Sequence, residues 1–262
     1  MRVTPREMSR KAPPSSLAAG DAALGGPDLA TVRAYFDRHD ACGRNCFQVQ
    51  VRAGIVRDLV GPLTRASVVD LGCGDAGVSR QFLDGGNTLV LVDISPRMLE
   101  RARRNLPPDA SGHVRWVEAD LTCYGPPERF DLALCIGVLA HVESVERALR
   151  QVACLTRPGG CCVIQFTDSS RRCARWHHAF ARARLALLRR PGYLTNRVTD
   201  EQLHEFTERA GLRQVDRRRY SLLLPGMRRL PDRWLTRLER ATLGRPWLSR
   251  HGMEVITLYE RV

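Results

Sequence analysis

Lysine is almost absent from this sequence. Lys11 is the only one, so arginine supplies the other 40 of the 41 basic residues, and with 28 acidic residues the formal charge is +13. Such a skew indicates coding bias as much as a polyanionic partner. Residues 1–167 hold 20 basic and 18 acidic side chains, whereas residues 168–262 hold 21 and 10. The basic excess therefore belongs to the last third, where it indicates either an anionic ligand or a solvated arginine-rich surface.

Long apolar runs are also missing. No stretch of about 18 apolar residues occurs, and charges and prolines interrupt the N-terminal region where a secretory signal would be apolar. We therefore expect a soluble, cytoplasmic protein. The nine cysteines form only two close sets, Cys42 with Cys46 and Cys161 with Cys162, and no second pair completes a zinc site. We expect buried reduced thiols and no bound metal.

The pattern of apolar residues predicts one large α/β domain. Residues 1–28 lack apolar periodicity and are interpreted as a disordered leader, while residues 29–66 have helical spacing. Across residues 67–167, short apolar strands alternate with helices, which is typical of a parallel, doubly wound sheet. A further helix and two strands follow, separated by arginine-rich inserts at 168–198 and 221–250 that we expect to be caps. The domain then spans residues 29–262.

The stretch VVDLGCGDAG at residues 68–77 contains G-x-G-x-x-G directly after a predicted strand, and Asp93 follows at the end of the next strand. This spacing satisfies the dinucleotide fingerprint. Asp70, however, precedes the first glycine by two residues, and a carboxylate near the ligand would repel pyrophosphate. It would attract the ammonium and sulfonium groups of S-adenosylmethionine, whose two ribose hydroxyls Asp93 could bind. A nicotinamide cofactor stays open if Asp70 points away from the ligand.

Five motifs in order resemble those of class I S-adenosylmethionine-dependent methyltransferases: VVDLGCGDAG, LVLVDIS, VEADL, FDLALCIGVLAHV and LTRPGG. The resemblance covers residues 29–166. It implies a Rossmann-like seven-stranded sheet, mostly parallel with the last strand antiparallel, and S-adenosylmethionine as the cofactor with S-adenosylhomocysteine as the product. The cofactor-binding residues that it implies are Tyr35, Arg52, Asp70, Gly72, Cys73, Gly74, Asp93, Ile94, Met98, Asp120, Leu121, Ile136 and Gly137.

Individual roles follow from the same resemblance. Asp120 would accept a hydrogen bond from the adenine amino group, and Ile94 and Met98 would flank the adenine ring. Tyr35 would close over the cofactor and Arg52 would meet its carboxylate, while the Ile136-Gly137 pair would line the methionine side. Simpler interpretations exist: Asp70 as a loop hydrogen-bonding residue, Asp120 as a turn residue, and the two apolar side chains as ordinary core.

The methyl acceptor needs a base only if it arrives protonated. His141, in GVLAHV after the fourth strand, is the candidate, because an ordinary histidine transfers protons near neutral pH. A structural histidine that caps the next helix is the competing interpretation. Related small-molecule enzymes often have V-L-E-H-V here, and Ala140 replaces that glutamate.

In the first insert, Trp176 is a candidate substrate contact, as are His177 and His178, which are also second-choice bases.

We therefore expect an enzyme that methylates oxygen, nitrogen or carbon of a small molecule, such as a secondary metabolite or a quinone-like or lipid-like compound, with an anionic group that suits the arginines. One alternative is an RNA methyltransferase that uses the basic C-terminal third, although no N-P-P-Y or D-P-P-Y motif is present. Another is a non-catalytic protein that keeps the cofactor fold. The pattern leaves open whether the chain is a monomer or a homodimer.

Overall fold

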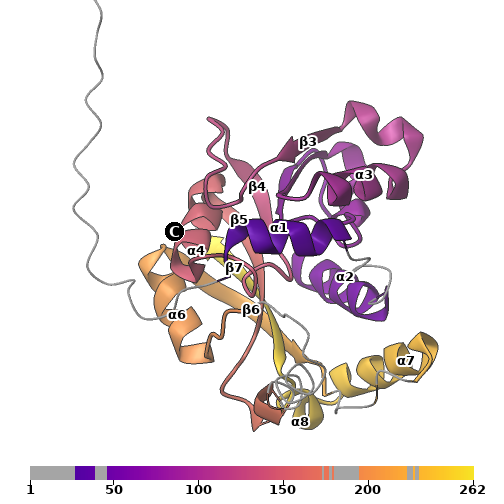
Figure 1. Cartoon of the computed structure of the whole chain (residues 1–262), viewed down its shortest axis with the longest axis vertical. Coiled ribbons are helices and arrows are strands. Elements are labelled where there is room, and N and C mark those ends of the chain that lie inside the picture. Colours follow the sequence, from indigo (N-terminus) through magenta and orange to yellow (C-terminus); the bar gives the residue numbers. More distant parts are fainter. Residues whose placement is uncertain are drawn as a thin grey trace, which may run out of the picture.

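A computed structural model describes residues 27–38, 46–172, 174–176, 179, 195–222, 227 and 230–262, so residues 1–26 of the predicted leader lie outside it. Seven strands form one sheet in the order β3-β2-β1-β4-β5-β7-β6 (Figure 1). The strands are β1 (Ser67–Leu71), β2 (Thr88–Asp93), β3 (Val114–Glu118), β4 (Phe130–Cys135), β5 (Thr156–Thr167), β6 (Leu212–Tyr220) and β7 (Glu254–Arg261).

The last strand runs against all the others. Strands β1 to β5 pair in parallel, whereas β7 lies antiparallel between β5 and β6. This confirms the predicted mostly parallel sheet with an antiparallel last strand. It also departs from the 3-2-1-4-5-6 order of a dinucleotide-binding sheet, in which no strand is inserted between the fifth and sixth.

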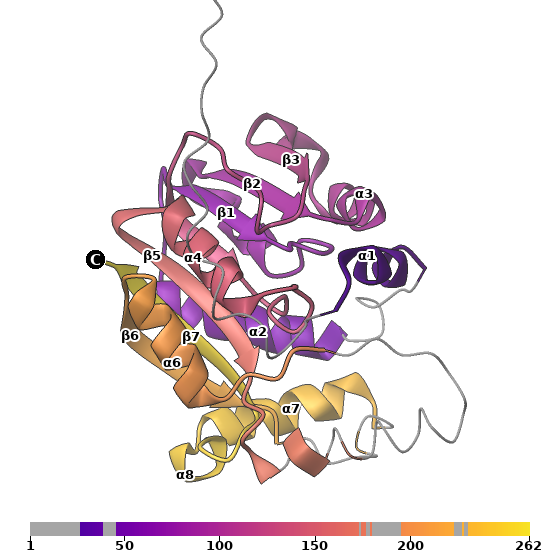
Figure 2. The same ribbon diagram turned by 60° about the vertical axis from the view of Figure 1, so that its left-hand side comes forward.

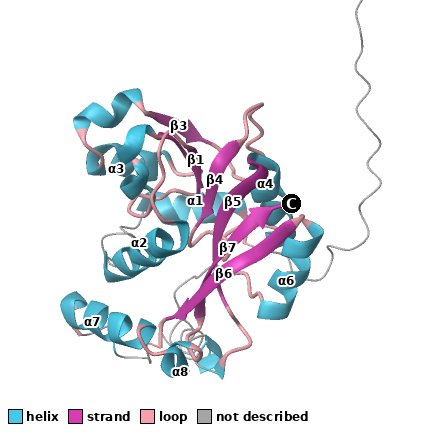
Figure 3. Cartoon of the chain, turned by 180° about the vertical axis from the view of Figure 1, so that it is seen from behind, coloured by secondary structure: helices cyan, strands magenta, loops and turns pink. Residues whose placement is uncertain are grey.

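Helices cover both faces of the sheet (Figures 2 and 3). Apolar side chains of α4 (Val145–Leu155) and α6 (Asp200–Arg209) fill the core on one face. Those of α2 (Cys46–Val60) and α3 (Pro96–Asn105) fill the core on the other. The described residues also form α1 (Leu29–Arg38), which packs against α3, and, within the second insert, α7 (Asp232–Leu243) and the short α8 (Pro246–Ser249). The role of the inserts as caps stays a prediction. No helix among the described residues combines the length and apolarity needed to cross a bilayer.

Helix caps follow the sequence signals. Ser95 accepts a hydrogen bond from the Met98 amide at 3.2 Å, with Pro96 in the first turn of α3. Thr199 begins α6 with a full capping box, in which its hydroxyl and the Gln202 side chain each bind the other residue's backbone amide. Ser95 and Thr199 therefore fix the residues at which α3 and α6 begin.

The segment between β1 and β2 differs from the predicted helix. It forms only two short 3₁₀ turns, Ser79–Phe82 and Asp84–Gly86. Asn87 explains the early stop, because its side-chain amide donates to the backbone carbonyls of Leu63, Phe82 and Asp84 while its oxygen accepts from the Ala66 amide. The carbonyls of Phe82 and Asp84, which a longer helix would have paired with its own amides, are therefore satisfied by this side chain.

The prediction for cysteine is only partly correct. The six cysteines whose side chains are described are all free, and Cys73, Cys135 and Cys162 are buried. Cys123 and Cys154 are exposed instead, because each lies at an outward position of a turn or helix.

Ion pairs hold the first residues of the insert at 168–198 against β6. The buried Asp168, just after β5, lies 2.9 Å from the Arg219 guanidinium and 3.1 Å from that of Arg171. Arg219 also reaches Asp200 at 2.9 Å. The arginines of β6 are therefore engaged in structural pairing, and the insert begins from a fixed point.

Candidate active site

A cavity of about 630 Å³ lies at the carboxyl edge of the sheet. The loops that follow β1, β2, β3 and β4 form one side of it, and α1 and α2 close the other. Every predicted cofactor residue except Asp70 lines this cavity, together with His141. These residues come from six separate segments of the chain, and the fold brings them together.

The glycine loop and Asp93 form one hydrogen-bonded unit. The Gly74 amide donates to one carboxylate oxygen of Asp93 at 2.8 Å, and the Ser95 amide donates to the other at 2.9 Å. Gly72 has a φ of 76°, and a Cβ there would lie 2.3 Å from a Val138 methyl carbon. Only glycine fits between the loop and the segment after β4. Burial raises the pKa of Asp93, and the two amide donors partly offset this.

Asp70 lies behind the loop. Its side chain is buried and is not among the residues that line the cavity. The pKa of this carboxyl is raised to about 7, mainly by burial. The nearby Ser79 hydroxyl acts in the opposite direction, and the charges of Asp93 and Asp75 contribute to the rise. The sequence pattern predicted a carboxylate beside the ligand, but the end of β1 turns this one into the core. Its cofactor role stays a prediction and would act through the loop.

Asp120 has a structural role as well as a place in the cavity. Its two carboxylate oxygens accept hydrogen bonds from the Thr122 amide at 2.9 Å and the Thr122 hydroxyl at 2.6 Å. The turn that it stabilises places Leu121 in the wall. Ile94 and Met98 line the same part of the cavity, and Met98 is also fully buried. Core packing and ligand contact are therefore compatible for these residues.

Arg52 lies over the end of β4. Its Nε donates to the Tyr220 hydroxyl at 3.0 Å, and a Cβ on Gly137 would lie 2.9 Å from its Nη1. Gly137 has a φ of 79°, so a side chain there would be both strained and in the way of the guanidinium. Burial raises the pKa of Tyr220, which keeps this phenol neutral as an acceptor. The cation is thereby fixed beside the predicted methionine side of the cavity.

His141 packs against the aromatic pair of α1. Its ring meets Phe36 edge-on at 5.3 Å between centroids, and Phe36 meets Tyr35 edge-on at 5.4 Å. Burial and the charge of Arg52 lower the pKa of His141 to about 4. The imidazole is therefore neutral at physiological pH and can accept a proton. Phe36 was not predicted as a site residue, although it lies next to Tyr35 in a segment with helical spacing.

The first insert supports the loop that carries His141. The Asn196 amide donates to the Ala140 carbonyl at 2.9 Å, and its side chain donates to the Leu139 carbonyl at 3.1 Å. Thr195 beside it lines the cavity. No motif marks these residues in the sequence. Trp176 is 73% exposed and is not part of the lining, while His177 and His178 lie outside the described residues, so their substrate role stays a prediction.

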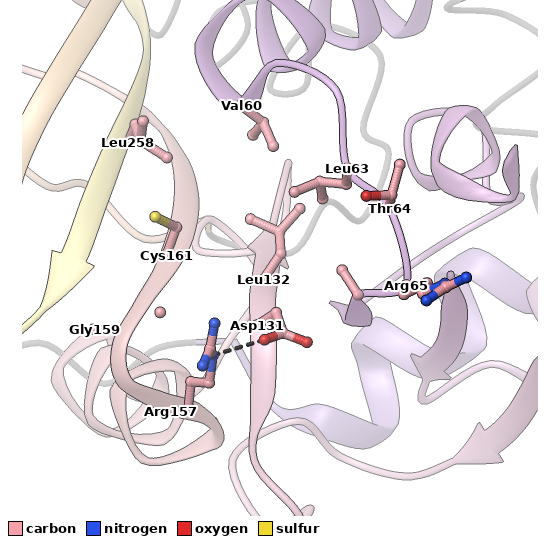
Figure 4. Close-up of a pocket in the computed structure, with 12 residues that line it drawn as sticks. Val60, Leu63, Thr64, Arg65, Asp131, Leu132, Arg157, Gly159, Cys161 and Leu258 are labelled. Carbon is pink, nitrogen blue, oxygen red and sulfur yellow. Dashed lines mark ion pairs between the residues drawn. The ribbon is translucent and has the colours of Figure 1, made fainter. Parts of the chain in front are cut away.

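A second cavity, of about 440 Å³, lies at the amino edge of the sheet (Figure 4). Asp131, in β4, pairs with the Arg157 guanidinium at 2.6 Å and accepts hydrogen bonds from the amide and hydroxyl of Ser67 at 2.7 and 2.8 Å. Burial raises the pKa of Asp131, but the Ser67 hydrogen bonds and the Arg157 charge bring it below the usual value. The charges of Asp131 and Arg157 in this cavity already satisfy each other.

Comparisons with known proteins agree with this geometry. Residues 69–164 match the family model described as "Methyltransferase domain". An uncharacterised methyltransferase of Mycobacterium bovis is 32% identical over 122 residues, which cover 46% of this chain and 60% of that protein. A ubiquinone biosynthesis O-methyltransferase of Bordetella pertussis is 27% identical over 42% of this chain and 46% of its own. The chain thus spans about half the length of these relatives.

A solved structure extends the likeness to nearly the whole fold. Magnesium protoporphyrin IX methyltransferase from Synechocystis, with bound S-adenosylhomocysteine, has a TM-score of 0.62 and 16% identity, and the match covers 90% of this chain and all of that one. At this identity the likeness concerns the fold alone.

Proposed function

This chain has the core of a class I S-adenosylmethionine-dependent methyltransferase, and on that premise we propose that it transfers a methyl group to a small-molecule acceptor. One observation carries the proposal. Asp93, Asp120 and Arg52, to which the family resemblance assigns the ribose, the adenine and the cofactor carboxylate, all line one cavity together with the glycine loop.

The donor set fits that cofactor. S-adenosylmethionine supplies a methyl group on a sulfonium, a good leaving group, so catalysis needs mainly orientation of the acceptor and exclusion of water. Asp93 is held by two backbone amides and keeps lone pairs for hydroxyl donors. The guanidinium of Arg52 matches the geometry of a carboxylate.

The acceptor side of the cavity favours an apolar or aromatic compound. Four residues of α1 contribute to the lining, all of them apolar or aromatic: Leu29, Val32, Tyr35 and Phe36. Such a wall suits a quinone-like or lipid-like acceptor better than a polynucleotide, and two of the similar proteins are named for ubiquinone biosynthesis and magnesium protoporphyrin. The methylated atom stays open among oxygen, nitrogen and carbon, and an anionic group on the acceptor stays a prediction.

His141 is the proposed base for an acceptor that arrives protonated. Its imidazole is neutral at physiological pH and lines the cavity next to the α1 aromatics. In the proposed step, the acceptor atom forms the bond to the methyl carbon, the carbon–sulfur bond breaks with its electrons left on sulfur, and the acceptor proton moves to the imidazole.

Calorimetric titration tests the cofactor assignment directly. We expect micromolar binding of S-adenosylhomocysteine and no heat from reduced nicotinamide dinucleotide under the same conditions. Binding of the nicotinamide compound, or of neither, would contradict the proposal. The acceptor is then sought with methyl-labelled S-adenosylmethionine and panels of phenols, quinols and carboxylic acids, with label transfer as the readout.

A further inference from the structure

Helix α7 has its apolar and polar faces in an unusual arrangement. Leu235, Glu239 and Thr242 are buried against the protein, so two of the three inward residues are polar. Trp234 and Leu238 point outward, with 54% and 43% of their surfaces exposed, and Ala241 continues the same line one turn later. We call these three residues the α7 stripe. An apolar stripe at helical spacing on the solvent side indicates a surface that is covered in use.

The helix is firmly attached to the rest of the protein. Leu235 packs with Phe47 of α2 in a small apolar cluster. The carboxylate of Glu239 accepts a hydrogen bond from the Ser221 amide at 3.0 Å. The inward face is therefore occupied by specific contacts, and α7 cannot simply rotate to bury its stripe. Helix α2, against which α7 packs, also lines the large cavity through Arg52.

Arginines lie along one side of the stripe, and no acidic side chain of the described residues pairs with them. In the described part of the chain, no carboxylate lies within ion-pair distance of Arg233, Arg237 or Arg240. Arg237 instead lies over the Trp234 ring at 5.6 Å. The arginines of β6 differ, because Arg213, Arg217, Arg218 and Arg219 each pair with an acid. Among the described residues, the three arginines of α7 therefore differ from those of β6, which are neutralised by acids.

The neighbouring segments add two exposed tryptophans. Trp247 in α8 is 62% exposed and Trp176 is 73% exposed, and Leu230 just before α7 is also exposed. Figures 1 and 2 both place α7, α8 and the short helical piece that contains Trp176 together at one end of the molecule. Three of the four tryptophans in the chain therefore lie exposed at this end.

From this chemistry we propose that the α7 stripe docks on the surface of an anionic lipid bilayer. Tryptophan rings prefer the headgroup level, leucine gains by entering the acyl boundary, and the arginines along one side of the stripe meet lipid phosphates while their stems lie along the apolar layer. A polynucleotide would use the arginines and tryptophans, but it offers nothing to Leu238 and Leu230.

Vesicle binding tests this inference without any use of the enzymatic reaction. The full chain is mixed with vesicles of phosphatidylcholine alone or with phosphatidylglycerol added, and the bound fraction is measured by flotation. We expect binding only to the anionic vesicles, a decrease as salt rises, and a blue shift of tryptophan fluorescence on binding. Equal binding to both lipids, or binding to neither, would overturn the inference.

Matched variants locate the surface. The double variant Trp234→Ser, Leu238→Ser should lower the partition coefficient by at least about tenfold, whereas Val215→Ser, which alters a side chain 51% exposed on β6, should change it less than about twofold. Arg233→Gln with Arg240→Gln should weaken binding, while Arg129→Gln in an exposed loop should not. Ellipticity of each variant confirms folding.

Two other occupants are distinguished by the same variants. If the stripe were a contact between two copies of the chain, sedimentation would show a concentration-dependent dimer that the double serine variant abolishes, with no effect of lipid. If it bound nucleic acid, single-stranded RNA would be retained and vesicles ignored. Either result would replace the proposed occupant. Failure here leaves the cofactor titration untouched, so the two proposals are tested separately.

Discussion

The two edges of the central sheet use charged residues in opposite ways. At the amino edge, Asp131 is matched by Arg157 and by two donors of Ser67, so its cavity contains a completed set of contacts. At the carboxyl edge, two backbone amides donate to Asp93, and Arg52 donates to the hydroxyl of Tyr220. The described carboxylate thus meets a cation at the first edge and neutral amide donors at the second.

This difference shows that a cavity alone does not identify a site. Both edges have cavities of several hundred Å³ with a carboxylate and an arginine in the wall. They differ in what meets the carboxylate: the Arg157 guanidinium for Asp131, and backbone amides for Asp93. Burial raises the pKa of Asp93, a cost that the fold accepts at the carboxyl edge, whereas at the amino edge pairing lowers the pKa of Asp131.

The largest expected effect is on cofactor affinity. Asp93→Asn should weaken S-adenosylhomocysteine binding by at least about 100-fold, because two hydrogen bonds to a charged acceptor contribute about 1.5 kcal/mol or more each. Asp131→Asn, the same change at the other edge, should leave the affinity within about twofold. Calorimetry of both variants measures this, and equal losses would show that the edges are not functionally distinct.

The next effect concerns stability at the amino edge. Asp131→Asn should lower the free energy of unfolding by about 1 kcal/mol at pH 7, since it removes a largely exposed ion pair and weakens a charged hydrogen bond. The pKa of Asp131 is depressed in the folded protein, so its contribution is present at neutral pH and disappears as pH falls through that lowered value. Urea unfolding of wild type and variant should therefore converge in strong acid. A constant difference at all pH values would contradict the assigned charge.

Local sequence signals predicted the carboxyl edge better than its surroundings. The glycine loop after the first strand, the acid-ended strand and the histidine after the fourth strand each depend on a few neighbouring residues. The fold therefore followed from the sequence, including the antiparallel last strand that the family resemblance implied. The predicted residues Asp93, Asp120 and His141 do share one cavity.

Features set by distant contacts were missed. Asn87 shortens the expected helix through carbonyls up to 24 residues away, and Asn196 supports the His141 loop from 55 residues later in the chain. Asp70 was placed by its distance from the glycines, but which way its side chain turns depends on packing around Ser79. Periodicity carries no information on such contacts.

A smaller effect should follow from Tyr220→Phe, which removes the acceptor for Arg52 Nε at the carboxyl edge. One hydrogen bond of about 1 kcal/mol corresponds to a loss of about fivefold in S-adenosylhomocysteine affinity, because the guanidinium is less well oriented. Tyr259→Phe is the matched control. Tyr259 is also a buried tyrosine in the paired strands β6 and β7, but it packs in the core on the other face of the sheet. If both variants bind equally well, Tyr220 does not position Arg52.

Among the cavity residues tested, His141 should have the smallest effect on cofactor affinity. It should instead change how the stability of the protein depends on pH. His141→Phe should change S-adenosylhomocysteine affinity less than about threefold, since the histidine serves the acceptor. In the folded protein its pKa is about 4, below the usual 6.5, so between these values the unfolded chain binds a proton that the native chain does not. Wild type should therefore lose stability relative to His141→Phe as pH falls from about 6.5 to 4, before the Asp131 contribution at the amino edge is lost. Proton NMR of the imidazole gives the value directly, and titration near 6.5 would mean that the carboxyl edge is open to water and that neither burial nor Arg52 acts on this ring.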